Sequence, residues 1–167
     1  MGGNPTLEEF EKNLPTFRFT VLRHDLPLHA QRECHWDLLL EPPDNSPDAP
    51  HLAANATLFY SAAGLLTFEV PMQPEEWNNN QFAVKRLPDH RLVYQNYEGP
   101  ISGDRGHVKR VQSGFIQWKV LAEDLLVLSV RQTWPKETES IGLVTIAKLP
   151  GNSENSWELE WRVETGL

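Results

Sequence analysis

Short segments in which apolar and polar residues alternate are the feature that most limits what this chain can fold into. The clearest is Trp-Glu-Leu-Glu-Trp-Arg-Val at 157–163, which has one apolar face and one charged face. A period of two is that of a β-strand with one buried side. Comparable segments, or short apolar runs bounded by turn residues, lie at 17–22, 35–41, 56–60, 65–70, 82–86, 92–97, 108–111, 115–121, 125–132 and 141–148. The chain is therefore predicted to be all-β.

The number and spacing of these segments predict a closed or nearly closed β-barrel of about eight to ten strands, with a β-sandwich as the alternative. A short helix is expected in an N-terminal arm at 1–16, where Thr6 and Glu9 form a capping box and Pro15 ends the element. The polar stretch 75–80 is predicted to be a surface loop. The 167 residues, 40% of them hydrophobic, are enough for one domain over 1–167 that buries its own core.

Composition argues against a membrane or secreted protein. No apolar run approaches the roughly 20 residues that cross a bilayer, and the first residues lack the order of a secretory signal. Cys34 is the only cysteine, so an internal disulfide is excluded and a cytoplasmic setting is expected. We expect Cys34 to be a small buried residue.

Charge is distributed unevenly along the chain. The net charge is -8 overall, yet the segment 81–119 holds seven basic and three acidic residues. A basic strip on an acidic body can hold a few phosphates, while long-range attraction to nucleic acid is weak. A solvated face of mixed charge is the alternative interpretation of the same strip.

Two histidines and one aspartate are candidates for a metal site. His35 and Asp37 are two residues apart in a predicted strand, so both side chains project from the same face. An imidazole and a carboxylate placed in this way can share a divalent ion when a third ligand joins them. His24 ends the preceding predicted strand, and a hairpin through 26–34 would bring it alongside. The alternative is that these histidines only satisfy hydrogen bonds.

His90 is a further candidate, because it follows Asp89 directly and precedes the segment Arg91-Leu92-Val93-Tyr94. Its functional interpretation is a phosphate donor or an acid–base group. The alternative is a turn histidine that pairs with its own neighbour Asp89.

The order of these segments resembles the 3'-phosphoesterase domain of bacterial DNA ligase D. That family opens with an Arg-Phe-x-x-x-x-Lys-His run and a His-Tyr-Asp-Phe-Arg-Leu-Glu strand, to which residues 18–24 and 35–41 are similar. Residues 70–74, Val-Pro-Met-Gln-Pro, are similar to its Val-Pro-Lys-Gly-Pro segment. Residues 89–94 and 97–99 are similar to its Asp-His-Pro-Leu-x-Tyr and Phe-Glu-Gly stretches. The resemblance extends from about residue 17 to residue 118.

The resemblance implies a β-barrel that holds a divalent ion, manganese in the first place and zinc or another metal as alternatives. Members trim 3' ends of DNA or of DNA with 3' ribonucleotides and remove 3'-phosphates before repair ligation. A separate ligase or polymerase would then be a partner. Carried over to this chain, the metal ligands are His24, His35 and Asp37, and the residues facing the phosphate are His90 and Tyr94. Basic residues that could contact the phosphate are Arg91, Arg105, Lys109 and Arg110.

The chain departs from the family at three positions where a basic residue is expected, namely Leu39, Met72 and Gln81. Its spacing between His24 and His35 is also longer. These departures support a second hypothesis, a barrel that has lost catalysis and binds DNA or a repair protein. A third hypothesis is an iron oxygenase in which His35, Asp37 and a distant histidine, His90 or His107, form a two-histidine, one-carboxylate site.

Overall fold

The computed structural model describes residues 14–31, 33–43, 64–151 and 153–163, and this part of the chain is mainly β. Its strands are β1 (Phe17–Asp25), β2 (His35–Leu40), β3 (Gly64–Val70), β4 (Asn80–Arg91), β5 (Gly99–Pro100), β6 (His107–Leu121), β7 (Leu125–Trp134), β8 (Ser140–Lys148) and β9 (Ser156–Val163). Three short 3-10 turns join them, η2 (Pro74–Glu76), η3 (Leu92–Gln95) and η4 (Lys136–Thr138). The predicted helix in the N-terminal arm and the predicted strand at 56–60 fall outside the described residues.

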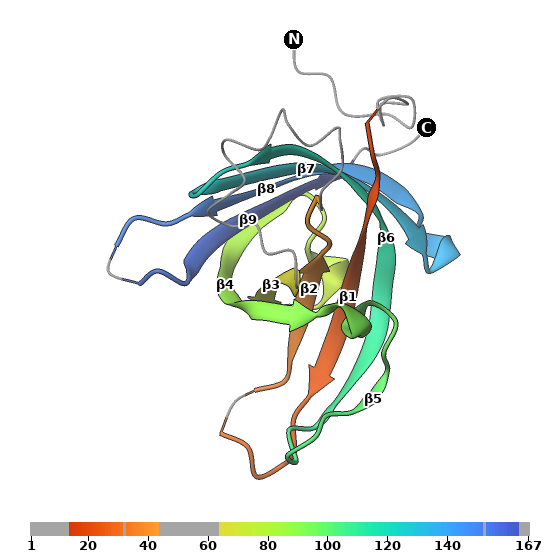
Figure 1. The fold of residues 1–167 in the computed structure, drawn as a ribbon, viewed down its shortest axis with the longest axis vertical. Helices are drawn as coiled ribbons and strands as arrows, with labels where there is room; N and C mark the ends of the chain where they lie inside the picture. The colour runs from red at the N-terminus through yellow and green to blue at the C-terminus, as the bar shows by residue number, and fades with distance from the viewer. Residues whose placement is uncertain (1–13, 32, 44–63, 152, 164–167) are drawn as a thin grey trace.

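Eight of these strands form a ring of antiparallel, hydrogen-bonded neighbours (Figure 1). Their order is β1-β2-β3-β4-β9-β8-β7-β6, and β6 pairs back with β1. β5 adds two residue pairs to β6 outside this ring. Because each ring strand has a partner on both sides, the ring offers no long unpaired edge. The prediction of a mainly β chain is confirmed.

One large apolar cluster fills the interior of the ring. It takes buried side chains from all eight ring strands, among them Phe19, Leu38, Phe68, Phe82, Ile116, Leu128, Val144 and Trp161. The ring of Trp161 packs edge-on against Phe19 and tilted against Trp77, with centroid separations of 5.9 Å and 5.4 Å. Each ring strand contributes about every second side chain to this interior cluster. This explains why the segments that alternate in the sequence are strands in the structure.

One strand prediction was wrong, and two other predicted strands are parts of a single strand. Residues 92–97 begin with the 3-10 turn η3, and Leu92 and Val93 are 49% and 54% exposed. The residues of this segment that pack against an apolar cluster, the smaller of two, are Tyr94 and Tyr97, which are three apart and so suit a turn better than a strand. The predicted strands 108–111 and 115–121 belong to one strand, β6, whose pairing shifts register opposite Val21 and again at Gly114.

Two further expectations need correction. Trp77 lies within the stretch predicted as a polar surface loop, yet it is 1% exposed and packs into the interior cluster. Its Nε1 donates a hydrogen bond to the Met72 carbonyl at 2.8 Å, so the loop folds back and buries its one large apolar residue. Cys34, expected to be buried, is exposed in the connection between β1 and β2.

Candidate functional site

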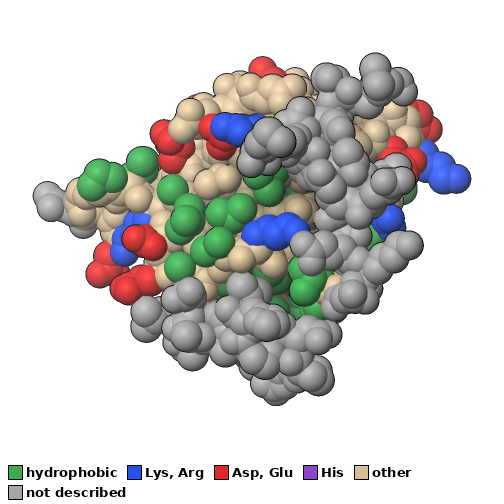
Figure 2. Space-filling model, turned by 90° about the horizontal axis from the view of Figure 1, so that it is seen from above, with side chains coloured by type: hydrophobic (Ala, Val, Ile, Leu, Met, Phe, Trp, Pro, Cys, Tyr) green, Lys and Arg blue, Asp and Glu red, His purple; other side chains and the backbone are tan. Residues whose placement is uncertain are grey.

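The candidate site lies on the face of β2 that points away from the ring interior. Trp36, Leu38 and Leu40 contact the interior cluster. Alternation along the strand places His35, Asp37 and Leu39 on the opposite face. A second, smaller apolar cluster covers that face, built from Leu22, Leu39, Leu65 and Val108, with Tyr94, Tyr97 and Ile101 packed against it. On the face of the molecule seen from above in Figure 2, no described histidine side chain is visible.

The three predicted metal ligands converge. His24 pairs with His35 across β1 and β2, which places the two side chains on the same face. One potential ligand atom from each of His24, His35 and Asp37 lies within 4.8 Å of the other two. His35 Nε2 is 3.2 Å from Asp37 Oδ1, and His24 Nδ1 is 3.8 Å from Asp37 Oδ2. The two-residue spacing of His35 and Asp37, together with the pairing of β1 with β2, therefore brings together the three metal ligands that the resemblance implied.

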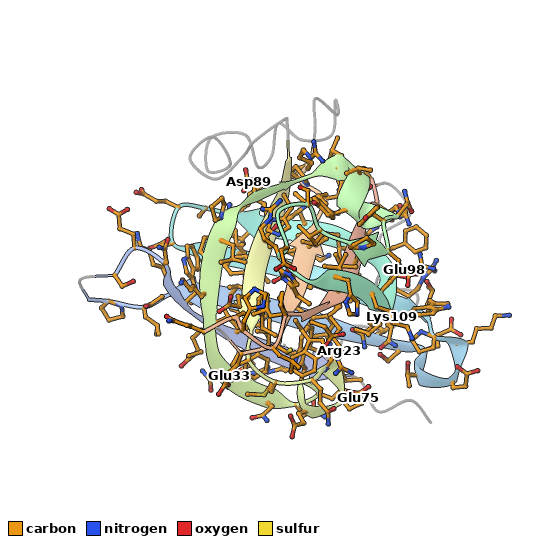
Figure 3. All side chains as sticks on the ribbon, turned by 90° about the horizontal axis from the view of Figure 1, so that it is seen from below. Arg23, Glu33, Glu75, Asp89, Glu98 and Lys109 are labelled. Carbon is orange, nitrogen blue, oxygen red and sulfur yellow. The ribbon has the colours of Figure 1, made fainter. Side chains whose placement is uncertain are left out.

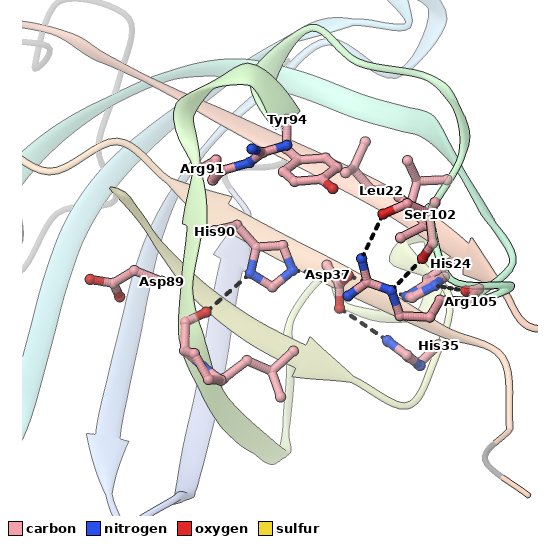
Figure 4. Close-up of a pocket in the computed structure, with 14 residues that line it drawn as sticks. Leu22, His24, His35, Asp37, Asp89, His90, Arg91, Tyr94, Ser102 and Arg105 are labelled. Atoms are coloured by element: carbon pink, nitrogen blue, oxygen red, sulfur yellow. Dashed lines mark hydrogen bonds and ion pairs between the residues drawn. The ribbon is translucent and has the colours of Figure 1, made fainter. Parts of the chain in front are cut away.

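Asp37 is the centre of this arrangement (Figure 4). Its side chain is 2% exposed, and its Oδ1 has no hydrogen-bond partner despite the short distance to His35. His90 approaches from β4, with Nε2 3.8 Å from Asp37 Oδ2. Asp89 does not pair with His90, because it binds Arg86 at 2.6 Å. A buried carboxylate without its hydrogen bonds is costly, so a cation placed among these imidazoles would relieve it.

Main-chain carbonyls orient all three imidazole rings. The contacts are His24 Nε2 with Arg105 at 2.8 Å, His35 Nδ1 with Glu33 at 3.3 Å and His90 Nδ1 with Pro88 at 3.0 Å. A carbonyl oxygen only accepts, so each of these nitrogens carries the hydrogen, and in a neutral ring the other nitrogen keeps its lone pair. In each ring that other nitrogen faces Asp37. Metal-binding histidines are commonly held in this way.

The charge state of His35 reflects its surroundings. Burial disfavours the imidazolium and by itself lowers the pKa of His35. Attraction to the Asp37 carboxylate 3.2 Å away, together with the charge of Glu69, outweighs burial, so the pKa of His35 is raised above 6.5. The ring is thus surrounded by negative charge that favours a bound cation, whether a proton or a metal ion.

A pocket of about 550 Å³ opens beside these groups and holds most of the predicted phosphate contacts. Its lining includes His24, His35, Asp37, His90, Arg91, Tyr94 and Arg105. Hydrogen bonds to the Ser102 carbonyl at 2.7 Å and to its hydroxyl at 3.2 Å fix the Arg105 guanidinium. The Tyr94 ring packs edge-on against His90 at 5.8 Å. In Figure 4, His90 and Arg91 come from β4, Tyr94 from η3 and Arg105 from the loop before β6.

Arg110 and Lys109 do not line this pocket. The Arg110 guanidinium lies over the Trp134 ring, 4.8 Å from its centroid. Lys109 is exposed beside Arg23, its cross-strand neighbour, as Figure 3 shows from below. The structure thus brings Arg91 and Arg105 to the pocket and leaves Arg110 and Lys109 elsewhere. His107, named in the iron-oxygenase hypothesis, contacts Asp25 at 3.4 Å and is also outside the lining.

The three departures from the family pattern have different surroundings. Leu39 is 1% exposed and sits in the smaller apolar cluster, next to Asp37 on the same face. Met72 packs against the interior cluster instead. Gln81 is exposed on β4 and donates a hydrogen bond to Glu158 of β9. Of the three, only Leu39 packs in the apolar cluster beside the candidate site.

Glu69 is a residue of this site that the sequence reasoning missed. It lies on β3 directly across from Asp37, and its Oε1 is 3.6 Å from His35 Nε2. The signal was present, since Glu69 is the one charged residue in the strand Gly64–Val70, in which only Thr67 is otherwise polar. A lone acidic residue in a buried strand indicates that a cation or hydrogen-bond donor is near.

Comparisons with known proteins leave the family open. No model of a protein family matches the chain, and no curated protein matches it. Among the described residues, no helix has the length and apolar character that crossing a bilayer requires.

Proposed function

We propose that this protein is a divalent-metal-dependent phosphoesterase that acts on 3' ends of DNA or of DNA tipped with ribonucleotides. The observation that supports the proposal is the convergence of His24, His35 and Asp37 within 4.8 Å beside a pocket with two arginines. The donor set suits the group, because two oriented imidazoles and one buried carboxylate are ligands that manganese or zinc accepts.

The ring of eight strands is consistent with the β-barrel of the resembling family, and we extend the proposal to that architecture. The setting we propose is DNA repair in the cytoplasm, in which the trimmed 3' end passes to a separate ligase or polymerase. The exposed Cys34 agrees with a reducing compartment.

The residues of the pocket have distinct proposed roles. When bound, the metal ion supplies Lewis-acid stabilisation of negative charge on the phosphate. Arg91 and Arg105 contribute fixed positive charge for the phosphate oxygens, and the hydrogen bonds to Ser102 preorganise Arg105. Tyr94 donates its phenolic hydrogen to the same group. His90 holds or accepts a proton at Nε2, because its Nδ1 is occupied by the Pro88 carbonyl.

The direct test is incubation of the full chain with manganese and a primer–template that ends in a 3'-phosphate, with release of inorganic phosphate as the readout. His24→Gln should abolish release. His29→Gln is the matched control, since His29 is 71% exposed, contacts Asp104 and lies outside the pocket. Absence of release by the wild type, or release that survives His24→Gln, would overturn the proposal.

The second candidate is a non-catalytic member of the same architecture that binds DNA or a repair protein. Leu39 favours it, because an apolar side chain occupies the face where the family carries an arginine. A charge-assisted hydrogen bond to phosphate is worth about 1.5–3 kcal/mol, so its loss weakens both binding and turnover. Metal and DNA binding without phosphate release would favour this candidate over the enzyme.

A further inference from the structure

Glu69 places a second carboxylate at the candidate metal site. It is the cross-strand neighbour of Asp37, so both side chains project from the same face of β2 and β3. Its Oε1 lies 3.6 Å from His35 Nε2, the same nitrogen that is 3.2 Å from Asp37 Oδ1. The side chain is 22% exposed, which places it at the edge of the buried centre.

The two distances that start from His35 Nε2 are those expected between ligands of one ion. Metal–ligand bonds of about 2.0–2.2 Å at tetrahedral or octahedral angles separate neighbouring ligand atoms by roughly 2.8–3.6 Å. The distances from His35 Nε2 to Asp37 Oδ1 and Glu69 Oε1 both fall in that range. His24 Nδ1, at 3.8 Å from Asp37 Oδ2, is slightly farther and still close enough to share the ion after a small movement.

The charges of the face support the same conclusion. Like charges placed directly across two strands are unfavourable, and here one of the two carboxylates is nearly fully buried. A divalent cation between Asp37 and Glu69 would turn this repulsion into attraction to a shared centre. The competing role for Glu69 is an ion pair with Lys85, its other cross-strand neighbour, on β4.

We infer that Glu69 is a fourth protein ligand of the divalent ion, which completes a set of two imidazoles and two carboxylates. This inference rests on the metal site of the proposed function, though not on the phosphoesterase reaction. A second hard oxygen ligand favours manganese relative to the softer zinc. Glu69 is therefore a determinant of which metal the protein retains.

Metal binding without DNA tests the inference. The affinity of the full chain for Mn²⁺ is measured by the electron paramagnetic resonance signal of free Mn²⁺, and that for Zn²⁺ by competition with a chromophoric chelator. Glu69→Gln should weaken Mn²⁺ binding by roughly 10–100-fold, a loss of the size seen when groups around a metal are removed. The loss for Zn²⁺ should be smaller. Glu69→Asp, which keeps the carboxylate on a shorter side chain, should lie between wild type and Glu69→Gln.

Lys85→Gln is the control for the structural alternative. It removes the cross-strand cation but no proposed ligand, so it should leave Mn²⁺ affinity unchanged. Wild-type Mn²⁺ affinity in Glu69→Gln, or an equal loss in Glu69→Gln and Lys85→Gln, would overturn the inference. If Glu69→Gln does not fold, Glu69→Asp decides alone, and wild-type affinity there overturns it. If Glu69→Gln weakens Mn²⁺ binding as predicted but the wild type releases no phosphate, the proposed phosphoesterase activity is refuted and the inference about Glu69 is supported.

Discussion

Replacing Asp37 by asparagine should separate the folding of this protein from its metal binding. Asparagine keeps the shape of the side chain and removes the charge that lies between His24, His35 and His90. Its cost to the metal-free protein should be small, because Oδ1 already lacks a hydrogen-bond partner. The metal-bound state should instead lose its most buried anionic ligand.

The magnitude follows from binding linkage. An ion present at 100 times its Kd stabilises the folded state by about 2.7 kcal/mol. For a chain of this length each kcal/mol moves Tm by roughly 2–4 °C. The wild type should therefore gain about 5–11 °C on addition of Mn²⁺ at that concentration. Asp37→Asn should gain less than about 2 °C at the same concentration, because its affinity is too low for saturation.

Differential scanning fluorimetry with Mn²⁺ and with EDTA measures both values. The control is His29→Gln, whose imidazole lies outside the pocket. The EDTA samples should unfold within a few degrees of one another, which shows that the variants are folded. A full Mn²⁺ shift in Asp37→Asn would refute the assignment of Asp37 as a metal ligand, and with it the reasoning from its buried, unpartnered oxygen.

Three other predictions address the interior, the loop and the proton. Trp161→Ala should lower the free energy of unfolding by about 3–5 kcal/mol in urea titrations, while Mn²⁺ affinity under folding conditions stays unchanged; a large change in affinity would contradict the separation of the two faces. Gly106 has φ of 85°, and a Cβ there would lie 1.9 Å from a β1 carbonyl oxygen. Gly106→Ala should cost about 1–3 kcal/mol and weaken Mn²⁺ binding, because the Arg105 carbonyl that orients His24 is displaced; unchanged values in both assays would refute this. The pKa of His35 is raised above 6.5, and a metal ion must displace the proton of the imidazole. Mn²⁺ affinity should therefore fall as the pH decreases, and the fall should begin above pH 6.5. An Mn²⁺ affinity that does not change between about pH 6 and 8 would argue against His35 as a ligand.

The sequence predicted the strands well because alternation is a local property. A buried face repeats every second residue, and the segments at 125–132 and 157–163 lie in strands, as does 35–41 apart from its last residue. Alternation does not say which strands pair, so the sequence did not predict that β1 and β6 are the two strands that close the ring. The strand prediction for residues 92–97 was wrong for a related reason. It placed the apolar residues Leu92 and Val93 in a buried strand, whereas both are exposed.

The part of the candidate site that depends on residue spacing within a strand and on pairing between consecutive strands could be predicted from the sequence. The two-residue spacing of His35 and Asp37 fixes their common face, and antiparallel pairing adds His24. Glu69 lies near His35 and the carbonyl of Arg105 lies near His24, and no local pattern in the sequence predicts either contact. Arg110 was a reasonable candidate by charge alone, yet the Trp134 ring holds its guanidinium elsewhere.

Alternate residues of strand β2 face the interior cluster and the pocket. This alternation restricts the insertions and deletions that the strand can tolerate. An insertion of one residue within His35–Leu40 would exchange the two faces of the strand for all residues that follow it. Leucine side chains would then lie at the candidate metal site, and a carboxylate would be buried in the apolar interior. Solubility and chemistry would then fail in the same mutant. Length variation among descendants of this chain should therefore gather in the connection at 26–34, and within β2 it should occur only in steps of two residues.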